Sequence, residues 1–253
     1  MQKIIVEREQ GIVWATFNRP ERRNAIDFDV MDELAALLAE VKQNRVDKVL
    51  VLTGAGDAFC SGGDLQLFHG LYTKEEAYPM LKKMGDILYE LMTLPKPTIA
   101  LLNGAAVGGG CEIAIACDYR FAASTAMVGF VQGHLAITTG WGGAAMLFEK
   151  LRHDQAMTFL CSAQRFGTKE AEQLGFVHEI FEGDVKLSCQ KWIESMLSPR
   201  VEVLSAYKMA AVRGWNAAYL KERMDQEIKE CAALWESPAH HAAVASFLHC
   251  KKV

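Results

Sequence analysis

The sequence lacks several features that would assign it to a particular class of protein. No stretch of its 253 residues approaches the roughly eighteen uncharged apolar residues of a membrane-spanning helix, and the start, MQKIIVEREQG, has no signal-peptide core. The net charge of −4 offers no basic field for nucleic acid or anionic lipid. We therefore expect a cytoplasmic protein with neither nucleic acid nor a membrane as partner.

Paired cysteines and clustered metal ligands are also missing from the sequence. Its seven cysteines are widely spaced without a CxxC pair, and no His, Asp and Glu residues occur at ligand spacing. This pattern favours reduced thiols and predicts no metal or redox cofactor. Cys60 and Cys111 lie in glycine-rich segments, where each is either a catalytic thiol or a small buried filler.

The sequence does contain alternating strand and helix patterns up to about residue 197. Buried-strand runs occur at IVWATFN, KVLVLTG and TIALLN, and helical periodicity occurs at FDVMDELAALLAEVK and from about residue 75 to 94. From about residue 198 only helical patterns remain. We predict an α/β core over residues 1–197 and a helical region over residues 198–253, which folds back on the core or packs on another subunit.

Two glycine-rich segments each follow a predicted strand and precede a helix. The first, GAGDAFCSGGDL at residues 54–65, has Asp64 at a helix-cap position, and the second, NGAAVGGGCE, spans residues 103–112. Such turns are common for chain reversal alone, and neither matches a nucleotide-binding fingerprint. If a parallel sheet placed them side by side, their bare amides would form an oxyanion hole for a carbonyl that gains negative charge.

Glu112 makes the functional interpretation stronger. Every neighbour in GGGCEIAIAC is small or apolar, so we expect this carboxylate to be buried. Burial of a charge is costly unless the group is paired or kept for chemistry. The second segment therefore predicts a catalytic acid or base beside the hole.

With these segments in hand, the chain resembles the crotonase superfamily, also called the enoyl-CoA hydratase/isomerase family. The resemblance covers nearly the whole length and is carried by FNRPERRNAID, LTGAGDAFCSGGDL, KPTIALLNGAAVGGGCEIAIACDYRFA, LAITTGWGG and RFGTKEAEQLGFVHEIF. It implies an α/β spiral of ββα repeats with a helical C-terminal region that trimerises, as a homotrimer or a dimer of trimers. It also implies an acyl-CoA thioester substrate, with no cofactor besides this coenzyme A.

The resemblance assigns roles to particular residues. The amides of Gly63 and Gly109 would hold the thioester oxygen, and Glu112 would act as acid or base. Residues expected to line the substrate site are Ala25, Cys60, Ser61, Asp64, Leu65, Gly108, Leu135, Thr139, Gly140 and Trp141. Arg22, Arg23 and Lys251 are candidates for the coenzyme A phosphates, with solvated surface charge as the alternative. The stretch from Tyr72 to Tyr78 is expected to shape acyl specificity.

The sequence departs from the hydratase pattern at one position. Hydratases of this family use a second glutamate in an FGxPE-type segment, whereas MVGFVQGHLAITTGWGG places Gln132 there. A neutral amide orients groups but does not transfer protons near pH 7. We expect lyase-type chemistry through an oxyanion-stabilised enolate with a single glutamate, and keep as the alternative a decarboxylase of short branched malonyl-type acyl-CoA, since ethylmalonyl-CoA decarboxylases are similar here.

Other interpretations stay open at this stage. His134 is either a proton donor or a rim or surface histidine, and Trp141 is either a pocket wall or a core residue. The whole protein is either an enzyme acting on acyl-CoA or a non-catalytic coenzyme A-binding protein.

Overall fold

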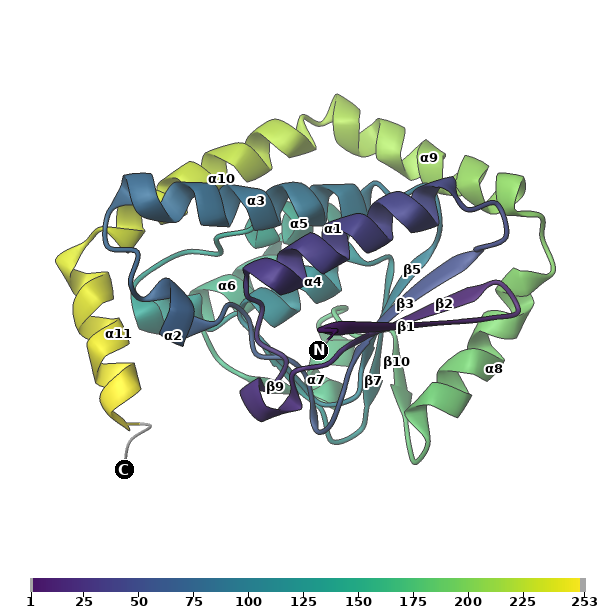
Figure 1. The fold of residues 1–253 in the computed structure, drawn as a ribbon, viewed down its shortest axis with the longest axis horizontal. Helices are drawn as coiled ribbons and strands as arrows, with labels where there is room; N and C mark the ends of the chain where they lie inside the picture. Colours follow the sequence, from purple (N-terminus) through teal and green to yellow (C-terminus); the bar gives the residue numbers. More distant parts are fainter. Residues whose placement is uncertain (1, 251–253) are drawn as a thin grey trace.

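The computed structural model describes residues 2–250 and contains two sheets, with helices packed around them (Figure 1). The larger sheet has the strand order β1-β2-β3-β5-β7-β10. Its strands are β1 (Ile4–Glu9), β2 (Ile12–Phe17), β3 (Val49–Gly54), β5 (Thr98–Leu102), β7 (Tyr119–Ala123) and β10 (Glu179–Phe181). All neighbours run parallel except the β1–β2 hairpin.

The strand and helix patterns of the first half are confirmed. Strand β5 is buried at every position, as its uninterrupted apolar run predicts. The helical pattern that begins at Phe28 forms α1 (Phe28–Gln43), whose N-terminus is capped by Asp27 through the amide of Val30 at 3.0 Å. The pattern from about 75 to 94 forms α3 (Lys74–Met92). Both helices bury an apolar stripe in the same core.

The smaller sheet is absent from the sequence-based prediction. It has the order β4-β6-β8-β9, with strands β4 (Ala58–Cys60), β6 (Ala105–Val107), β8 (Met127–Gly129) and β9 (Phe166–Gly167). Strands of two or three residues are too short to show a periodic pattern. This sheet is nevertheless what positions the site, because β4 and β6 pair in parallel and bring the two glycine segments together.

Short helical segments connect these strands. They are η1 (Pro20–Arg22), α2 (Leu65–Phe68), α4 (Gly109–Ala116), η2 (Gln132–Leu135), α5 (Gly143–Lys150), α6 (His153–Ser162) and α7 (Thr168–Gln173). Helix α4 is buried at all eight of its positions, so it runs through the centre of the core. A polar side chain on this helix is therefore shielded from bulk water and needs partners within the protein.

The C-terminal part is helical, as the sequence predicts. Its helices are α8 (Val185–Leu197), α9 (Val201–Ala217), α10 (Leu220–Trp235) and α11 (Pro238–Cys250). Helix α10 lies along α3 and α5 and buries Met224, Ile228 and Cys231 in the main core, so this part of the tail folds back on the body of its own chain (Figure 1). The predicted division at residue 197/198 falls between α8 and α9 and stays a prediction.

Within residues 2–250, no helix is long and apolar enough to cross a membrane.

Candidate active site

The two glycine turns lie against each other at the ends of β4 and β6. Gly62 has φ +92°, and a Cβ atom built on it would lie 3.0 Å from the amide nitrogen of Gly109. Only glycine combines this backbone conformation with so close an approach. The prediction that the two turns meet in a parallel sheet is therefore confirmed by the β4–β6 pairing and this contact.

The amides of Gly63 and Gly109 lie at positions where the neighbouring strand and helix do not take up their hydrogen bonds. Gly63 forms an isolated bridge with Ile26, but the bridge is made through the amides of Ile26 and Asp64. Gly109 is the first residue of α4, where amides have no partner within the helix. Two donors at this turn pair can serve one oxygen atom of a ligand.

Trp141 packs against both of these glycines. A Cβ atom on Gly109 would lie 2.1 Å from Cζ3 of the indole, and one on Gly63 would lie 3.5 Å from its Cζ2. The indole is only 4% exposed. Trp141 is thus a core residue that also forms a wall beside the predicted hole, which joins the two interpretations made from the sequence.

Glu112 is buried in the first turn of α4, as the sequence predicts. Its Oε1 accepts hydrogen bonds from the amides of Trp141 at 2.8 Å and Gly143 at 3.0 Å. Burial raises the pKa of Glu112 from its ordinary value to about 7, and these hydrogen bonds only partly offset that cost. A carboxyl group with this pKa exchanges protons near neutral pH.

Gln132 contacts the other oxygen of Glu112. Its Nε2 donates to Oε2 of Glu112 at 2.9 Å, while its Oε1 is buried with no hydrogen-bond partner among the described residues. A Cβ atom on Gly108, the residue before α4, would lie 3.8 Å from the Gln132 amide carbon. Gln132, which stands where hydratases of the family have their second glutamate, is therefore in direct contact with Glu112.

A second carboxylate, the half-buried Glu227 of α10, was missed by the sequence analysis. Its oxygens accept hydrogen bonds from the Thr139 hydroxyl, from the amide of Ala144 at 3.0 Å and from the amide of Ala145 at 2.8 Å. Burial and the nearby charge of Glu112 raise the pKa of Glu227 to about 7. A signal was present, since Glu227 lies beside the buried stripe of α10, three residues after Met224 and four before Cys231.

The two candidate thiols behave as buried fillers. Cys60 and Cys111 are both fully buried. Burial raises the pKa of Cys60 to about 12 and raises that of Cys111 as well, so neither forms the thiolate that a nucleophile needs. The filler interpretation is favoured over the catalytic one.

The residues around η1 and α2 form a polar rim beside Gly63. Asp64 is the N-cap residue of α2, but its side chain makes no capping bond and instead accepts from Arg19 at 3.0 Å. Arg19 also donates to the carbonyl of Ala25 at 2.6 Å. Arg22 is exposed and donates to Gln66 of α2. The cap predicted for Asp64 is therefore replaced by an ion pair.

The remaining predicted residues of this rim are less engaged. Ser61 and Arg23 are exposed, and the Ser61 amide donates to the Arg23 carbonyl at 3.0 Å. Leu65 is half-buried at the start of α2. Their substrate contacts stay predictions, and Lys251 lies outside the described residues.

The predicted residues of the segment 134–140 are held mainly by the C-terminal helices. The Leu135 carbonyl lies 2.7 Å from Nδ1 of His240, and the Thr139 hydroxyl is bound to Glu227. A Cβ atom on Gly140 would lie 2.8 Å from Cδ2 of Leu81. His134 is exposed, which favours the rim or surface interpretation.

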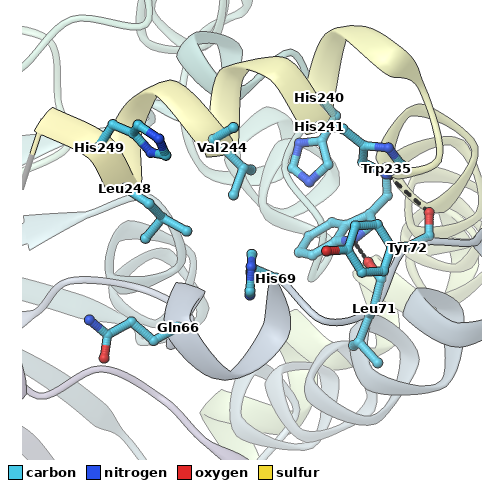
Figure 2. A pocket seen from close by; sticks show the side chains of 11 residues that line it. Gln66, His69, Leu71, Tyr72, Trp235, His240, His241, Val244, Leu248 and His249 are labelled. Atoms are coloured by element: carbon cyan, nitrogen blue, oxygen red, sulfur yellow. Dashed lines mark hydrogen bonds between the residues drawn. The ribbon is translucent and has the colours of Figure 1, made fainter.

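A cavity of about 490 Å³ lies between α2 and α11 (Figure 2). Its lining residues are Gln66, His69, Leu71, Tyr72, Trp235, His240, His241, Val244, Ala245, Leu248 and His249. Trp235 Nε1 donates to the Leu71 carbonyl at 2.8 Å, and the His241 ring lies 3.1 Å from the Tyr72 carbonyl. The first lining residue of the cavity, Gln66, lies three residues after Gly63 in the chain. Gly63, Gly109 and Glu112 are not among the lining residues.

Comparison with known proteins identifies the family. A model described as Enoyl-CoA hydratase/isomerase matches residues 7–252. The chain belongs to the enoyl-CoA hydratase/isomerase family. Solved members of similar fold include an enoyl-CoA hydratase/isomerase from Xanthobacter autotrophicus Py2, with a TM-score of 0.90 at 24% identity over 98% of this chain and 93% of that one. An enoyl-CoA hydratase from Bacillus halodurans gives a TM-score of 0.89 at 23% identity over 97% and 100%.

Curated relatives within this enoyl-CoA hydratase/isomerase family carry a more specific name. The ethylmalonyl-CoA decarboxylase of Danio rerio is 31% identical over 94% of this chain and 81% of the relative. That of Homo sapiens is 30% identical over 94% and 79%. The expected family and its α/β crotonase fold with a helical C-terminal region are confirmed, and these relatives agree with the alternative function better than with the main one.

Proposed function

We propose that this chain is an acyl-CoA decarboxylase, which removes carbon dioxide from a short malonyl-type thioester with a branch at the α-carbon. The observation that carries the proposal is the contact of Gln132 with Glu112 at 2.9 Å. Hydration of an enoyl-CoA by this family's pattern needs a second acid there, and an amide does not replace it. The ethylmalonyl-CoA decarboxylase relatives support the same choice.

The proposed reaction begins at the two glycine amides. The bond between the α-carbon and the substrate carboxylate breaks, and its electron pair moves into the thioester carbonyl. The resulting enolate oxygen accepts hydrogen bonds from the amides of Gly63 and Gly109, which would stabilise it most where its charge is greatest. Carbon dioxide leaves as a neutral product.

Glu112 would then donate its proton to the α-carbon of the enolate. The buried carboxyl has a pKa of about 7, so near neutral pH a large fraction of the protein carries this proton. Because Glu112 is buried, a protonated Glu112 also avoids a strong repulsion with the substrate carboxylate. After the transfer, Glu112 is reprotonated from solvent, so each turnover consumes one proton and one carboxylate.

Gln132 would serve both protonation states of Glu112. Its amide donates to an ionised carboxylate through Nε2, and after a half-turn of the amide it accepts from a carboxylic acid through Oε1. The unpartnered Oε1 of Gln132 fits this use. A glutamate at this position would add a second negative charge, and the titrations of the two carboxyl groups would then be coupled.

Glu227 does not supply the missing second acid in this proposal. Its carboxylate is bound by Thr139 and by two amides at the start of α5, and no hydrogen bond joins it to Gln132 among the described residues. We further propose that the enzyme works as a homotrimer or a dimer of trimers, with coenzyme A entering as part of the substrate.

The test is to incubate the protein separately with ethylmalonyl-CoA and with crotonyl-CoA. We expect butyryl-CoA and carbon dioxide from the first, with one solvent deuterium at the α-carbon in heavy water, and slow loss of enone absorbance from the second. Glu112→Gln should lower kcat for decarboxylation by about 10²-fold to 10⁴-fold, the usual contribution of a general acid. Glu230→Gln, on the exposed face of α10, is the matched control.

Rapid hydration of crotonyl-CoA by the unchanged protein would replace the proposal with a hydratase that uses one glutamate. A gain of hydration in Gln132→Glu, with loss of decarboxylation, would support the stated role of Gln132. Thermal stabilisation by acyl-CoA thioesters without any turnover would favour the coenzyme A-binding protein instead.

A further inference from the structure

Two carboxylates from distant parts of the chain are bound to one helix N-terminus. The amide of Gly143, the first residue of α5, donates to Glu112, and the next two amides, of Ala144 and Ala145, donate to Glu227. Three consecutive amides of one helix start therefore serve two different acids, the first Glu112 and the next two Glu227. The N-terminus of a helix carries about half a positive charge, which favours one nearby negative charge more than two.

The segment that presents these donors is shaped by α10, the helix that carries Glu227. A Cβ atom on Gly142 would lie 2.5 Å from Cε of Met224, so the turn is packed tightly on α10. The Thr139 hydroxyl donates to Glu227 and its oxygen lies 3.2 Å from the Ala144 amide. The same segment, residues 139–145, contains the amides of Trp141 and Gly143 that bind Glu112.

We propose that Glu227 is a positioning residue for Glu112. It fixes the segment 139–145 in the conformation that binds Glu112, and the two acids compete for a single negative charge at the start of α5. The inference rests on the proposed role of Glu112 as proton donor. It adds a reason for that role, because a carboxylate on Glu227 favours the protonated, proton-donating form of Glu112.

Several other titratable groups on α10 and on the helices packed against it have partners of their own or are uncharged. On α10 itself, Arg223 pairs with Glu149 of α5, and Cys231 is a buried thiol. From α3, Lys82 and Asp86 join Lys221 and Asp225 in a separate network. From α11, His240 is bound to the Leu135 carbonyl. Glu112 is therefore the acid whose charge Glu227 opposes, and that charge in turn raises the pKa of Glu227.

The experiment follows the protonated carboxyl groups directly, by infrared difference spectroscopy of the C=O stretch against pH. In the unchanged protein we expect a titration near pH 7. Glu227→Gln should move the Glu112 midpoint to lower pH by about one unit, a tenfold change in proton affinity. The fall of kcat on the alkaline side should move with it, with KM changed by less than about threefold. Glu112→Gln identifies which band belongs to Glu227 and should lower that midpoint too.

Controls separate this effect from a general loss of structure. Glu230→Gln removes a charge from the exposed face of the same helix and should leave midpoint and kcat unchanged. Thr139→Val keeps both acids but removes one donor to Glu227, so the Glu112 midpoint should move in the same direction by a smaller amount. If Glu227→Gln does not fold, this variant alone decides.

An unchanged Glu112 midpoint in Glu227→Gln, or in Thr139→Val where that variant has to decide, would overturn the inference, as would an equal shift in Glu230→Gln. The infrared measurement needs no turnover. A shifted midpoint in a protein that decarboxylates nothing would therefore reject the proposed function and leave the coupling of the two acids in place.

Discussion

The two ends of helix α4 show how the same helix serves stability at one terminus and chemistry at the other. At the C-terminal end, Lys150 donates to the carbonyls of Ile115 at 2.7 Å and Cys117 at 2.8 Å, and Arg120 donates to the Cys117 carbonyl at 2.9 Å. At the N-terminal end, the Gly109 amide is outside the ladder and Gln132 Oε1 has no partner in residues 2–250.

The difference teaches where to look for function in a buried helix. Cations at a helix C-terminus satisfy its last carbonyls and its dipole, and nothing remains there for a ligand. Unused donors and acceptors at the N-terminus cost free energy, which a purely structural site would avoid. Burial also acts in opposite directions, since it raises the pKa of Glu112 and lowers the pKa of Lys150.

The largest expected effect comes from filling the open end. Gly109→Ala would place a Cβ atom 2.1 Å from the Trp141 ring, so the turn or the indole must move. We expect kcat/KM for decarboxylation to fall by about 10²-fold or more, the cost of losing one oxyanion donor. Gly214→Ala in α9, where a Cβ atom meets nothing within 4 Å, is the matched control. Equal activity of the two variants would contradict the hole assignment.

A smaller effect is expected at the satisfied end. Lys150→Met removes donors from the last carbonyls of α4, and we expect the free energy of unfolding to fall by about 2 kcal/mol, measured by urea titration. The specific activity of the folded fraction should stay the same, because Lys150 donates to that end of the helix and lies over the Trp215 ring of α9, and contacts neither glycine turn among the described residues. A loss of kcat without a loss of stability would break the comparison between the two ends.

The last effect is a pH dependence of stability, which over any single pH unit is smaller than the loss expected for Lys150→Met. Glu112 has an ordinary pKa of 4.5 and a folded value of about 7, so the folded protein binds the extra proton between these values. Its contribution is complete below pH 4.5 and is lost as pH rises to 7, by at most about 1.4 kcal/mol per pH unit. Glu112→Gln should flatten this part of the curve of unfolding free energy against pH. A slope identical to that of the unchanged protein would show that Glu112 titrates normally.

Most of this arrangement could be predicted from local sequence, and the exceptions have a physical reason. The burial of Glu112 followed from its apolar neighbours, and the meeting of the glycine turns followed from their place after parallel strands. The second sheet could not be seen, because strands such as Phe166–Gly167 are too short for a pattern. Glu227 was missed because its partners lie more than eighty residues earlier in the chain.

The contact between Trp141 and Gly109 has a consequence for how such a chain can evolve. The indole fills the space that any side chain at residue 109 would need. Loss of the indole by itself would open a cavity beside Gly63, and gain of a side chain by itself would meet the ring. The two positions are therefore steric complements: a change at either one alone costs stability, and a side chain at residue 109 needs a smaller residue at 141.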